Sequence, residues 1–454
     1  MTVARRIAVI DIGKTNAKLA LVDGESLAEI EVRTRPNVVL DGPPWPHFDL
    51  EGHWAFLLDG LAAFRSGHGV DAISVTTHGA AAVLLDRVGG LAAPMLDYEH
   101  DGPGELAGAY DALRPDFAET GSPRLPAGLN LGAQLHWMLA TDPGLRDRIA
   151  AIVTYPQFWG FRLTGRMACD VSSLGCHTDL WNPWTGTPSA LVGRVGLSGR
   201  LAPPRLPTEV LGGLAPDVAA RTGIAEDTPV AVGIHDSNAS LYPHLAAREA
   251  PFAVVSTGTW VIAMAVGGRP GPLDPARDTL VNVDARGGAV PSARFMGGRE
   301  YDLLRPADAV VPTDADRAAV LDGLFLLPSV EPGSGPFPGR AGGFLTEPAT
   351  DGQRSLAIAW YLALMTETCL DLVGARGPTI VEGPFARNPD YLRMIAALRS
   401  DGVEASVSAT GTAAGAAMLL GAAKARPSGT RVQVGDGAAL RRYAARWREA
   451  AAQP

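Results

Sequence analysis

Apolar residues recur along the chain in short runs of strand length and in longer stretches with helical spacing. The first example is a hairpin, in which residues 7–10 and 17–22 are apolar runs and residues 13–16 form a tight polar turn. Residues 252–266 repeat this design, with one apolar strand on each side of a small polar turn. Two such hairpins, one near the start of each half of the chain, predict a duplicated architecture.

Other elements follow from the same periodicities. Strands are predicted at residues 73–77, 80–86, 229–236 and from 379 into a glycine turn at 383, and helices up to residue 64 and at 129–139, 355–373, 388–398, 411–425 and 440–451. Because strands and helices alternate in both halves, the predicted fold class is α/β. The strand at 229–236 ends on two polar residues and Pro251 restarts the chain, which predicts a domain boundary near 245–250 and domains at 1–246 and 247–454.

Composition narrows the class of protein. The chain has 454 residues, 46% hydrophobic and 19% charged, which is typical of a soluble globular enzyme with two or three domains. A net charge of −9 without a long basic run argues against nucleic acid and membrane surfaces as partners. No stretch approaches the roughly 20 apolar residues of a membrane span, and the apolar run after Arg5 and Arg6 is too short for a signal peptide. Three cysteines fit a reducing compartment, so we expect a cytoplasmic protein; its oligomeric state stays open, a homodimer included.

The turn of the first hairpin carries groups suited to phosphate. Gly13 allows the backbone to bend and approach a ligand, and Lys14, Thr15 and Asn16 supply donors for phosphate oxygens. Asp11 ends the first strand, where a carboxylate could hold Mg²⁺ through water. An ordinary hairpin with a polar turn explains the same residues. A Walker-type loop does not, because alanine stands five residues before Gly13, where that motif needs glycine.

Four pieces of the sequence, the fourth made of two segments, together resemble the FGGY family of carbohydrate kinases. They are the Asp-x-Gly-x-Thr-x-x-Lys loop at 11–18, the strand-end segment 233–239, the hairpin turn 256–260, and the segments 381–388 and 411–415, which are similar to adenosine-binding segments. Their order and spacing match that family across nearly the whole chain. The resemblance implies two ribonuclease-H-like (actin-like ATPase) domains with an interdomain cleft, and ATP and Mg²⁺ as cofactors.

The resemblance also assigns roles to single residues. Asp236 would be the catalytic base that accepts the proton of the attacking sugar hydroxyl; the alternative explanation is that it caps the helix that follows. Asp11 would hold the metal. The residues implied at the nucleotide are Gly13, Lys14, Thr15, Asn16, Lys18, Ser256, Thr257, Gly258, Thr259, Gly297, Gly383, Phe385 and Asn388. A polar hairpin turn, or a strand-to-helix turn with a cap, remains the alternative explanation for the residues of the second half.

The residues implied at the sugar are His78, Gly79, Asp97, Tyr98, His235 and Asp236. A histidine at a strand end is often structural, and His235 could serve only to orient Asp236. Residues 97–99 lie where many relatives carry a Trp-x-Asp-x-Arg sugar-binding segment, which is absent here, so the usual xylulose or glycerol contacts are not expected. Residues 282–298 resemble the rhamnulokinase branch, which favours a ketose or deoxyketose such as L-rhamnulose or L-fuculose.

These patterns predict an ATP-dependent sugar kinase, a phosphotransferase with an alcohol group as acceptor. The alternatives are a kinase for a pentulose or polyol, a regulator that binds sugar or nucleotide without catalysis, and a nucleotide hydrolase on the same fold. A serine hydrolase is disfavoured because the chain has no Gly-x-Ser-x-Gly elbow.

Overall fold

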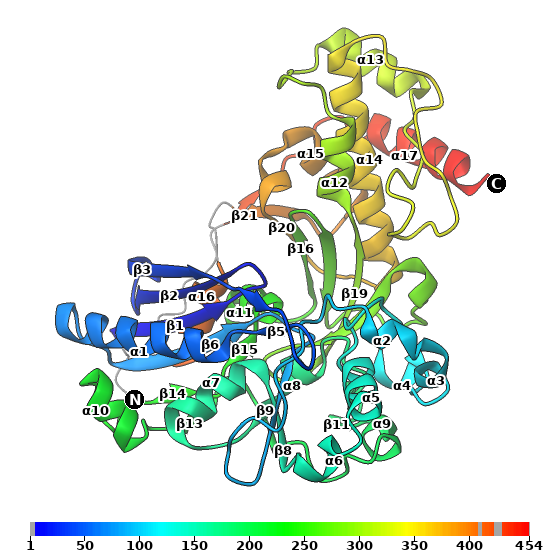
Figure 1. Cartoon of the computed structure of the whole chain (residues 1–454). Helices are drawn as coiled ribbons and strands as arrows, with labels where there is room; N and C mark the ends of the chain where they lie inside the picture. Colours follow the sequence, from blue (N-terminus) through cyan, green and yellow to red (C-terminus); the bar gives the residue numbers. More distant parts are fainter. Residues whose placement is uncertain (1–4, 407–410, 422–428, 454) are drawn as a thin grey trace. The chain divides into compact units, whose positions relative to one another are not determined.

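The computed structural model describes residues 5–406, 411–421 and 429–453, and the chain forms two compact units (Figure 1). Unit 1 comprises residues 1–247, 281–289 and 410–426, and unit 2 comprises residues 248–280, 290–409 and 427–454. The sequence suggested a single cut near residue 246. Two later segments also belong to unit 1, because Ala285, Ala413 and Ala416 are buried in its hydrophobic core.

Unit 1 is built on a seven-stranded sheet in the order β13–β14–β6–β1–β2–β3, with β15 also paired to β6. The central strand β1 is antiparallel to β2 and parallel to β6, which confirms the hairpin predicted from the first polar turn. The strands are β1 (Arg6–Ile12), β2 (Asn16–Asp23), β3 (Glu29–Pro36), β6 (Ala72–Thr77), β13 (Val210–Gly212), β14 (Val230–Ala231) and β15 (Ile234–His235).

Helices cover both faces of this sheet. Alternate residues of β1 point to opposite faces. On one face, Ile10 packs in a cluster with Leu57 and Phe64 of α1 (Leu50–Gly67), the helix that runs along the sheet in Figure 1. On the other face, Val9 packs in a cluster with Ala239 and Ala416, which lie on α11 (Asp236–Ala247) and α16 (Thr412–Met418). The apolar runs of β1 are therefore buried on both faces of the sheet.

The remaining elements of unit 1 are short. The small strands are β4 (Val39–Leu40), β5 (His47–Phe48), β7 (Ala82–Leu85), β8 (Ala151–Thr154), β9 (Cys169–Asp170), β10 (Trp181–Asn182), β11 (Thr187–Pro188) and β12 (Pro204–Arg205). The helices are α2 (Gly102–Glu105), α3 (Ala107–Asp111), α4 (Phe117–Thr120), α5 (Leu131–Thr141), α6 (Leu145–Arg148), α7 (Tyr155–Thr164), α8 (Val171–Leu174), α9 (Ala190–Arg194) and α10 (Pro216–Thr222).

The sheet of unit 2 repeats the arrangement of unit 1. Its order is β18–β19–β17–β16–β20–β21–β22, and the central strand β16 is antiparallel to β17 and parallel to β20. Strand β1 of unit 1 has the same two kinds of neighbour, so the predicted duplication is confirmed at the level of topology. The strands are β16 (Phe252–Thr257), β17 (Val261–Val266), β18 (Thr279–Val283), β19 (Ala289–Phe295), β20 (Thr379–Glu382), β21 (Val403–Ser406) and β22 (Gly429–Arg431).

Helix α14 (Asp351–Leu372) is the centre of the hydrophobic core of unit 2. Among the described residues it is the one helix long and apolar enough to cross a membrane, and 78% of its most apolar stretch is buried. The other helices are α12 (Gly297–Leu304), α13 (Asp314–Gly323), α15 (Pro389–Leu398) and α17 (Gly437–Ala452), with short 3₁₀ turns η1 (Pro275–Arg277) and η2 (Pro384–Arg387). The apolar side of α17, with Tyr443 and Trp447, is buried in this core.

The predicted strand at 229–236 was wrong as one continuous element. The structure divides it into β14 and β15, because Gly233 has a φ of 94°. The side-chain amide of Gln157 donates a hydrogen bond of 2.9 Å to the carbonyl oxygen of Val232, where a sheet partner would otherwise bind. The predicted helix at 411–425 begins as α16, and residues 422–425 lie outside the described part of the chain.

Candidate active site

The first polar turn of unit 1 opens into a cavity of about 420 Å³. Gly13 closes the turn through its amide, which donates 2.9 Å to the carbonyl of Asn16, and the side chain of Asn37 donates 2.8 Å to the carbonyl of Gly13. The residues that line the cavity are Asp11, Gly13, Thr15, Asn16, Lys18 and Thr34. Five of the predicted ligands are thus brought together, while Lys14 points elsewhere and contacts Asp97.

Asp11 is the single carboxylate in the lining of this cavity. Its Oδ2 accepts a hydrogen bond of 2.5 Å from the hydroxyl of Thr412 and lies 3.3 Å from the ammonium of Lys18. Burial raises the pKa of Asp11 above its ordinary value, and these two partners oppose that rise. No group of three or more metal-binding side chains gathers among the described residues, so a metal at Asp11 would need further oxygen ligands from a bound phosphate or from water.

Asp236 is the first residue of α11, directly after β15. Its Oδ1 accepts 2.6 Å from the amide of Ser237 and lies 3.1 Å from Nε2 of His235. Enclosure by the surrounding protein raises the pKa of Asp236 above that of an ordinary aspartate, while His78 in its charged form would lower it. Oδ2, for which no hydrogen bond is seen within the described residues, is left to accept a proton.

His235 holds Asp236 in place. The ring is buried, its Nδ1 lies 3.3 Å from the side-chain amide of Asn238, and its backbone amide donates 3.1 Å to the hydroxyl of Ser172. Burial lowers the pKa of His235 to about 4, so the ring is neutral at pH 7. With Nδ1 accepting from Asn238, the proton resides on Nε2 and points to Asp236. Gly79 makes room for this ring, since a Cβ there would lie 2.7 Å from Nε2 of His235.

His78 lies among aromatic rings beside these groups. Its ring centroid is 5.3 Å from that of Phe48 and 5.1 Å from those of Tyr98 and Tyr155. Nδ1 is 2.9 Å from the carbonyl of Gly79, which fixes the proton on Nδ1, and burial lowers the pKa of His78 to about 4. Nε2 is buried and finds no hydrogen-bond partner within the described residues. It is therefore a free acceptor for a ligand hydroxyl. The Tyr98 ring belongs to the same aromatic cluster, and Asp97 directly precedes it in the chain.

Unit 2 contains a cavity of about 850 Å³, the larger of the two. Among the predicted residues, Gly258, Thr259, Phe385 and Asn388 line it. Pro384 and Arg387, which also line it, lie in the predicted segment 381–388. Sequence reasoning missed further lining residues, which are Gly298, Tyr301, Asp302, Ala309, Val310, Val311, Pro312, Arg317, Ser355, Ala359, Pro389, Asp390 and Arg393. A cavity of this size is in the usual range for sites that bind small molecules and cofactors.

The other predicted residues of unit 2 support the wall of this cavity. The hydroxyl of Thr257 donates to the carbonyl of Glu382 and accepts 3.1 Å from the amide of Phe385, which ties the hairpin to the glycine turn. Ser256 lies in the ladder opposite Glu382 and Ile262. A Cβ on Gly383 would overlap the carbonyl of Thr257. The side chain of Asn388 caps α15, so the alternative explanation of this turn applies to Asn388 as well.

Two glycines open α12 beside the second hairpin. A Cβ on Gly297 would lie 2.7 Å from the side chains of Phe295 and Val261, and one on Gly298 would overlap the carbonyl oxygen of Gly258. The amide of Gly298 donates 3.1 Å to the carbonyl of Thr259. The helix start and the hairpin turn can approach this closely only because both glycines lack a side chain.

Comparisons with known proteins identify the family. A family model described as the carbohydrate kinase FGGY C-terminal domain matches residues 249–428. The chain is also 36% identical to a carbohydrate kinase from Novosphingobium aromaticivorans, whose crystal structure it matches with a TM-score of 0.90 over 99% of this chain and 98% of that one. The chain belongs to the FGGY carbohydrate kinases. The two sheets are accordingly those of two actin-like ATPase domains, as the sequence predicted.

Two curated relatives are more distant. The L-fuculokinase of Escherichia coli (strain K12) is 25% identical over 272 residues, which cover 57% of this chain and 56% of that protein. The rhamnulokinase of Klebsiella pneumoniae (strain 342) is 28% identical over 277 residues, 56% of this chain and 53% of that protein. The chain thus spans little more than half the length of the curated relatives it matches.

The FGGY segment at 411–415 lies in unit 1 and does not line the cavity of unit 2. Helix α16 packs so tightly on α11 that a Cβ on Gly415 would overlap the carbonyl of Ala239, and its first residue, Thr412, bonds to Asp11. The sequence carried no sign that the neighbours of this segment would be in unit 1.

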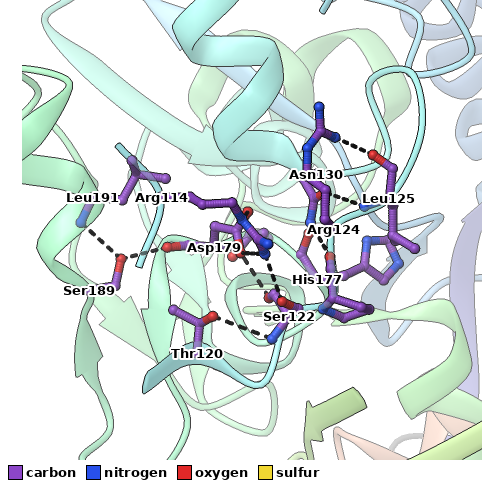
Figure 2. A network of polar contacts seen from close by, with 12 residues as sticks. Arg114, Thr120, Ser122, Arg124, Leu125, Asn130, His177, Asp179, Ser189 and Leu191 are labelled. Atoms are coloured by element: carbon purple, nitrogen blue, oxygen red, sulfur yellow. Dashed lines mark hydrogen bonds and ion pairs between the residues drawn. The ribbon is translucent and has the colours of Figure 1, made fainter. Parts of the chain in front are cut away.

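A polar network holds the segment beside His235 in this FGGY kinase (Figure 2). Arg114 donates 2.8 Å to the buried carboxylate of Asp179 and 2.8 Å to the carbonyl of Ser122, and Asn130 donates 3.1 Å to the carbonyl of His177. The network fixes the chain directly after Cys176, whose Sγ lies 3.5 Å from Nε2 of His235. Its members come from distant parts of unit 1, so no local sequence pattern marked them.

Proposed function

We propose that this chain is an ATP-dependent carbohydrate kinase that phosphorylates a hydroxyl of a small ketose or deoxyketose of the L-fuculose or L-rhamnulose kind. The observation that carries the proposal is the environment of Asp236, a partly enclosed carboxylate with a raised pKa whose Oδ1 is occupied by His235 and Ser237. Family membership and the names of the two curated relatives support the reaction and the sugar class.

The chemistry of the proposed step follows from these groups. Phosphoryl transfer needs positioning and charge stabilisation more than covalent catalysis. Oδ2 of Asp236 accepts the proton of the attacking hydroxyl, while His235 keeps the carboxylate oriented through Oδ1. Nε2 of His78 accepts a hydrogen bond from another hydroxyl and so fixes the sugar.

The chain also offers groups that fit ATP and Mg²⁺. In unit 2, the glycine contacts that bring α12 against the hairpin turn leave a cavity of about 850 Å³, large enough for a nucleoside. In unit 1, backbone and side-chain donors at Gly13, Thr15, Asn16 and Lys18 surround the Asp11 carboxylate and suit phosphate oxygens. Bound Mg²⁺ would offset phosphate charge near Asp11.

The first test is ADP release from Mg-ATP across a panel of ketoses, deoxyketoses and polyols, with Asp236→Asn in parallel. We expect one sugar class to be turned over, and a loss of about 10²- to 10⁴-fold in kcat in the variant with nucleotide binding retained, because a general base is removed. Asp147→Asn, at an exposed position of unit 1, is the matched control and should behave as wild type.

Four other outcomes would change the proposal. Turnover of the variant near the wild-type rate would refute the role of Asp236. ADP release that does not depend on sugar would indicate a nucleotide hydrolase. Tight sugar binding without phosphorylation of any sugar would indicate a regulator. Turnover confined to pentuloses or polyols would change the proposed substrate class to those sugars.

A further inference from the structure

Lys14 belongs to the phosphate turn by sequence, but its side chain leaves that turn. The cavity of unit 1 is lined by Gly13, Thr15 and Asn16 and not by Lys14. The Lys14 ammonium instead forms an ion pair with Asp97 and lies 3.1 Å from the carboxylate of Glu99. The cation within reach of the phosphate cavity is Lys18, which is 3.3 Å from Asp11.

Aromatic rings surround the Lys14 ammonium on the side of His78. It lies 4.8 Å from the ring centroid of Tyr98 and 5.1 Å from that of Phe48, and both rings also contact His78. The side chains of Lys14 and Asp97 are 23% and 11% exposed, so the pair is enclosed but still open on one side. Lys14 therefore lies in the group of side chains that also holds His78, and not with the phosphate ligands.

Each member of the ion pair keeps unused hydrogen-bonding capacity. An ammonium has three donors, and Asp97 and Glu99 account for two of them. Oδ1 of Asp97 accepts from both Lys14 and the amide of Glu99, which leaves its Oδ2 as an acceptor. A donor and an acceptor held side by side match two neighbouring hydroxyls of a sugar, and the rings of Tyr98 and Phe48 match a methyl group or an apolar sugar face.

We propose that Lys14 and Asp97 form a hydroxyl clamp that determines which sugar this kinase accepts, an inference that rests on the proposed kinase function. A site built to bind a hydroxyl through buried polar groups rejects analogues that lack it far more strongly than an apolar pocket rejects a missing methyl group. The clamp therefore selects the configuration of two hydroxyls, and the aromatic rings add a weaker preference for a deoxy sugar.

The test separates a sugar role from a phosphate role. Lys14→Met keeps the length of the side chain and removes its donors, and Lys18→Met is the matched change at the other lysine of the turn. We expect Lys14→Met to raise KM for the accepted sugar about tenfold to hundredfold, with KM for ATP changed by less than about twofold, since a hydrogen bond to a charged group is lost on the sugar only. Lys18→Met should instead raise KM for ATP and leave KM for the sugar nearly unchanged.

Two further variants protect the test against misfolding. Asp97→Asn keeps the shape of the clamp and should raise the sugar KM in the same way, while Lys14→Arg keeps the ion pair and should narrow the kcat/KM ratio between sugars epimeric at the clamped hydroxyls. Sugar affinity measured by calorimetry without nucleotide gives a readout that does not depend on turnover. A raised KM for ATP with an unchanged KM for the sugar in Lys14→Met would assign Lys14 to the phosphate site. Unchanged values of both KM would refute the proposed clamp.

The outcomes also separate this inference from the proposed function. Sugar turnover that depends on Asp236 but not on Lys14 or Asp97 would overturn the clamp alone. Sugar binding that weakens in the Lys14→Met and Asp97→Asn proteins, with no sugar phosphorylated by the wild type, would support the clamp and overturn the kinase.

Discussion

The hairpins β1–β2 and β16–β17 occupy the same place in their two sheets, but the side chains of their polar turns make different contacts. In unit 1, the side chains of Asp11 and Lys18 line a cavity and contact each other at 3.3 Å. In unit 2, the hydroxyl of Thr257 forms its hydrogen bonds with the neighbouring glycine turn. The two residues of this hairpin turn that line the cavity, Gly258 and Thr259, have no ionisable side chain. Unit 1 thus presents charges to its ligand, whereas the second hairpin presents backbone and shape.

This difference shows what duplication keeps. Topology and the apolar runs recur because each sheet must be buried on its faces, so both hairpins follow from the same pattern. The turns are free of that constraint, and their side chains can serve either a ligand or the fold. The same comparison predicts that unit 2 should be sensitive to added volume and unit 1 to lost hydrogen bonds.

Among the changes that test this comparison, Gly298→Ala is expected to have the largest effect. The new Cβ would overlap the carbonyl oxygen of Gly258 and push the hairpin turn away from α12. Overpacking of this kind costs about 1–3 kcal/mol, so we expect nucleotide affinity to fall about tenfold to hundredfold, as measured by titration with a fluorescent ATP analogue.

A glycine in open space gives the control. No atom lies within 4 Å of a Cβ built on Gly343, so Gly343→Ala in the same unit should bind nucleotide normally. Sugar affinity of Gly298→Ala should also stay normal, because the proposed sugar ligands belong to unit 1. Nucleotide affinity at the wild-type level in Gly298→Ala would mean that the close contact between α12 and the hairpin does not shape the site.

Local patterns predicted most of the architecture. The hairpins, the strand at β6 and the long helix α14 follow from the alternation or helical spacing of apolar residues, which each segment carries by itself. The prediction of one strand at 229–236 failed for two reasons. Gln157, far away in sequence, donates a hydrogen bond to one of the strand's carbonyl oxygens, and Gly233 bends the backbone.

The candidate site was predicted unevenly for a similar reason. The motif at 11–18 located a cavity, but nothing in it showed that Lys14 would turn away to Asp97, more than eighty residues later. The hydrogen bond from Thr412 to Asp11 joins residues 401 positions apart and has no local signal at all. Side-chain direction and long-range partners are set by tertiary packing, and the sequence pattern does not contain them.

Thr412→Val tests the charged site of unit 1 with a smaller change. The substitution keeps the volume of the side chain and removes the donor to Asp11, and a hydrogen bond to a charged group contributes about 1.5–3 kcal/mol. That hydrogen bond lowers the pKa of Asp11, so its loss should raise the pKa further. We expect turnover at limiting Mg²⁺ to fall about tenfold, more at pH 6 than at pH 8, with ATP affinity of unit 2 unchanged.

Thr412→Ser is the matched variant, since serine keeps the hydroxyl and loses only a methyl group. It should recover most of the activity and the wild-type pH profile. Equal losses in the serine and valine variants would assign the effect to packing of α16 against β1 and α11, and the hydrogen bond would then not matter for Asp11.

The smallest effect on turnover is expected from a buried carboxyl group of unit 2 that lies outside the lining of the large cavity. Glu367 on α14 is 4% exposed, its Oε2 has no hydrogen-bond partner within the described residues, and Arg399 lies 3.9 Å from its Oε1. Burial, with a contribution from the Asp371 carboxylate, raises the pKa of Glu367 to about 7. This group should affect stability and leave turnover unchanged.

The sign of the pH effect follows from proton binding. The folded protein holds a proton on Glu367 up to about pH 7, whereas the unfolded chain loses it near pH 4.3, so the free energy of unfolding falls as pH rises between these values, by at most about 1.4 kcal/mol per pH unit. Glu367→Gln should therefore raise the midpoint of thermal unfolding at pH 8 by about 3 °C or more and change it little near pH 4. Glu449→Gln, at an exposed position of α17 in the same unit, is the control and should have little effect at either pH. An equal gain for Glu367→Gln at both pH values would show that better packing, and not the removal of a buried charge, stabilises the variant.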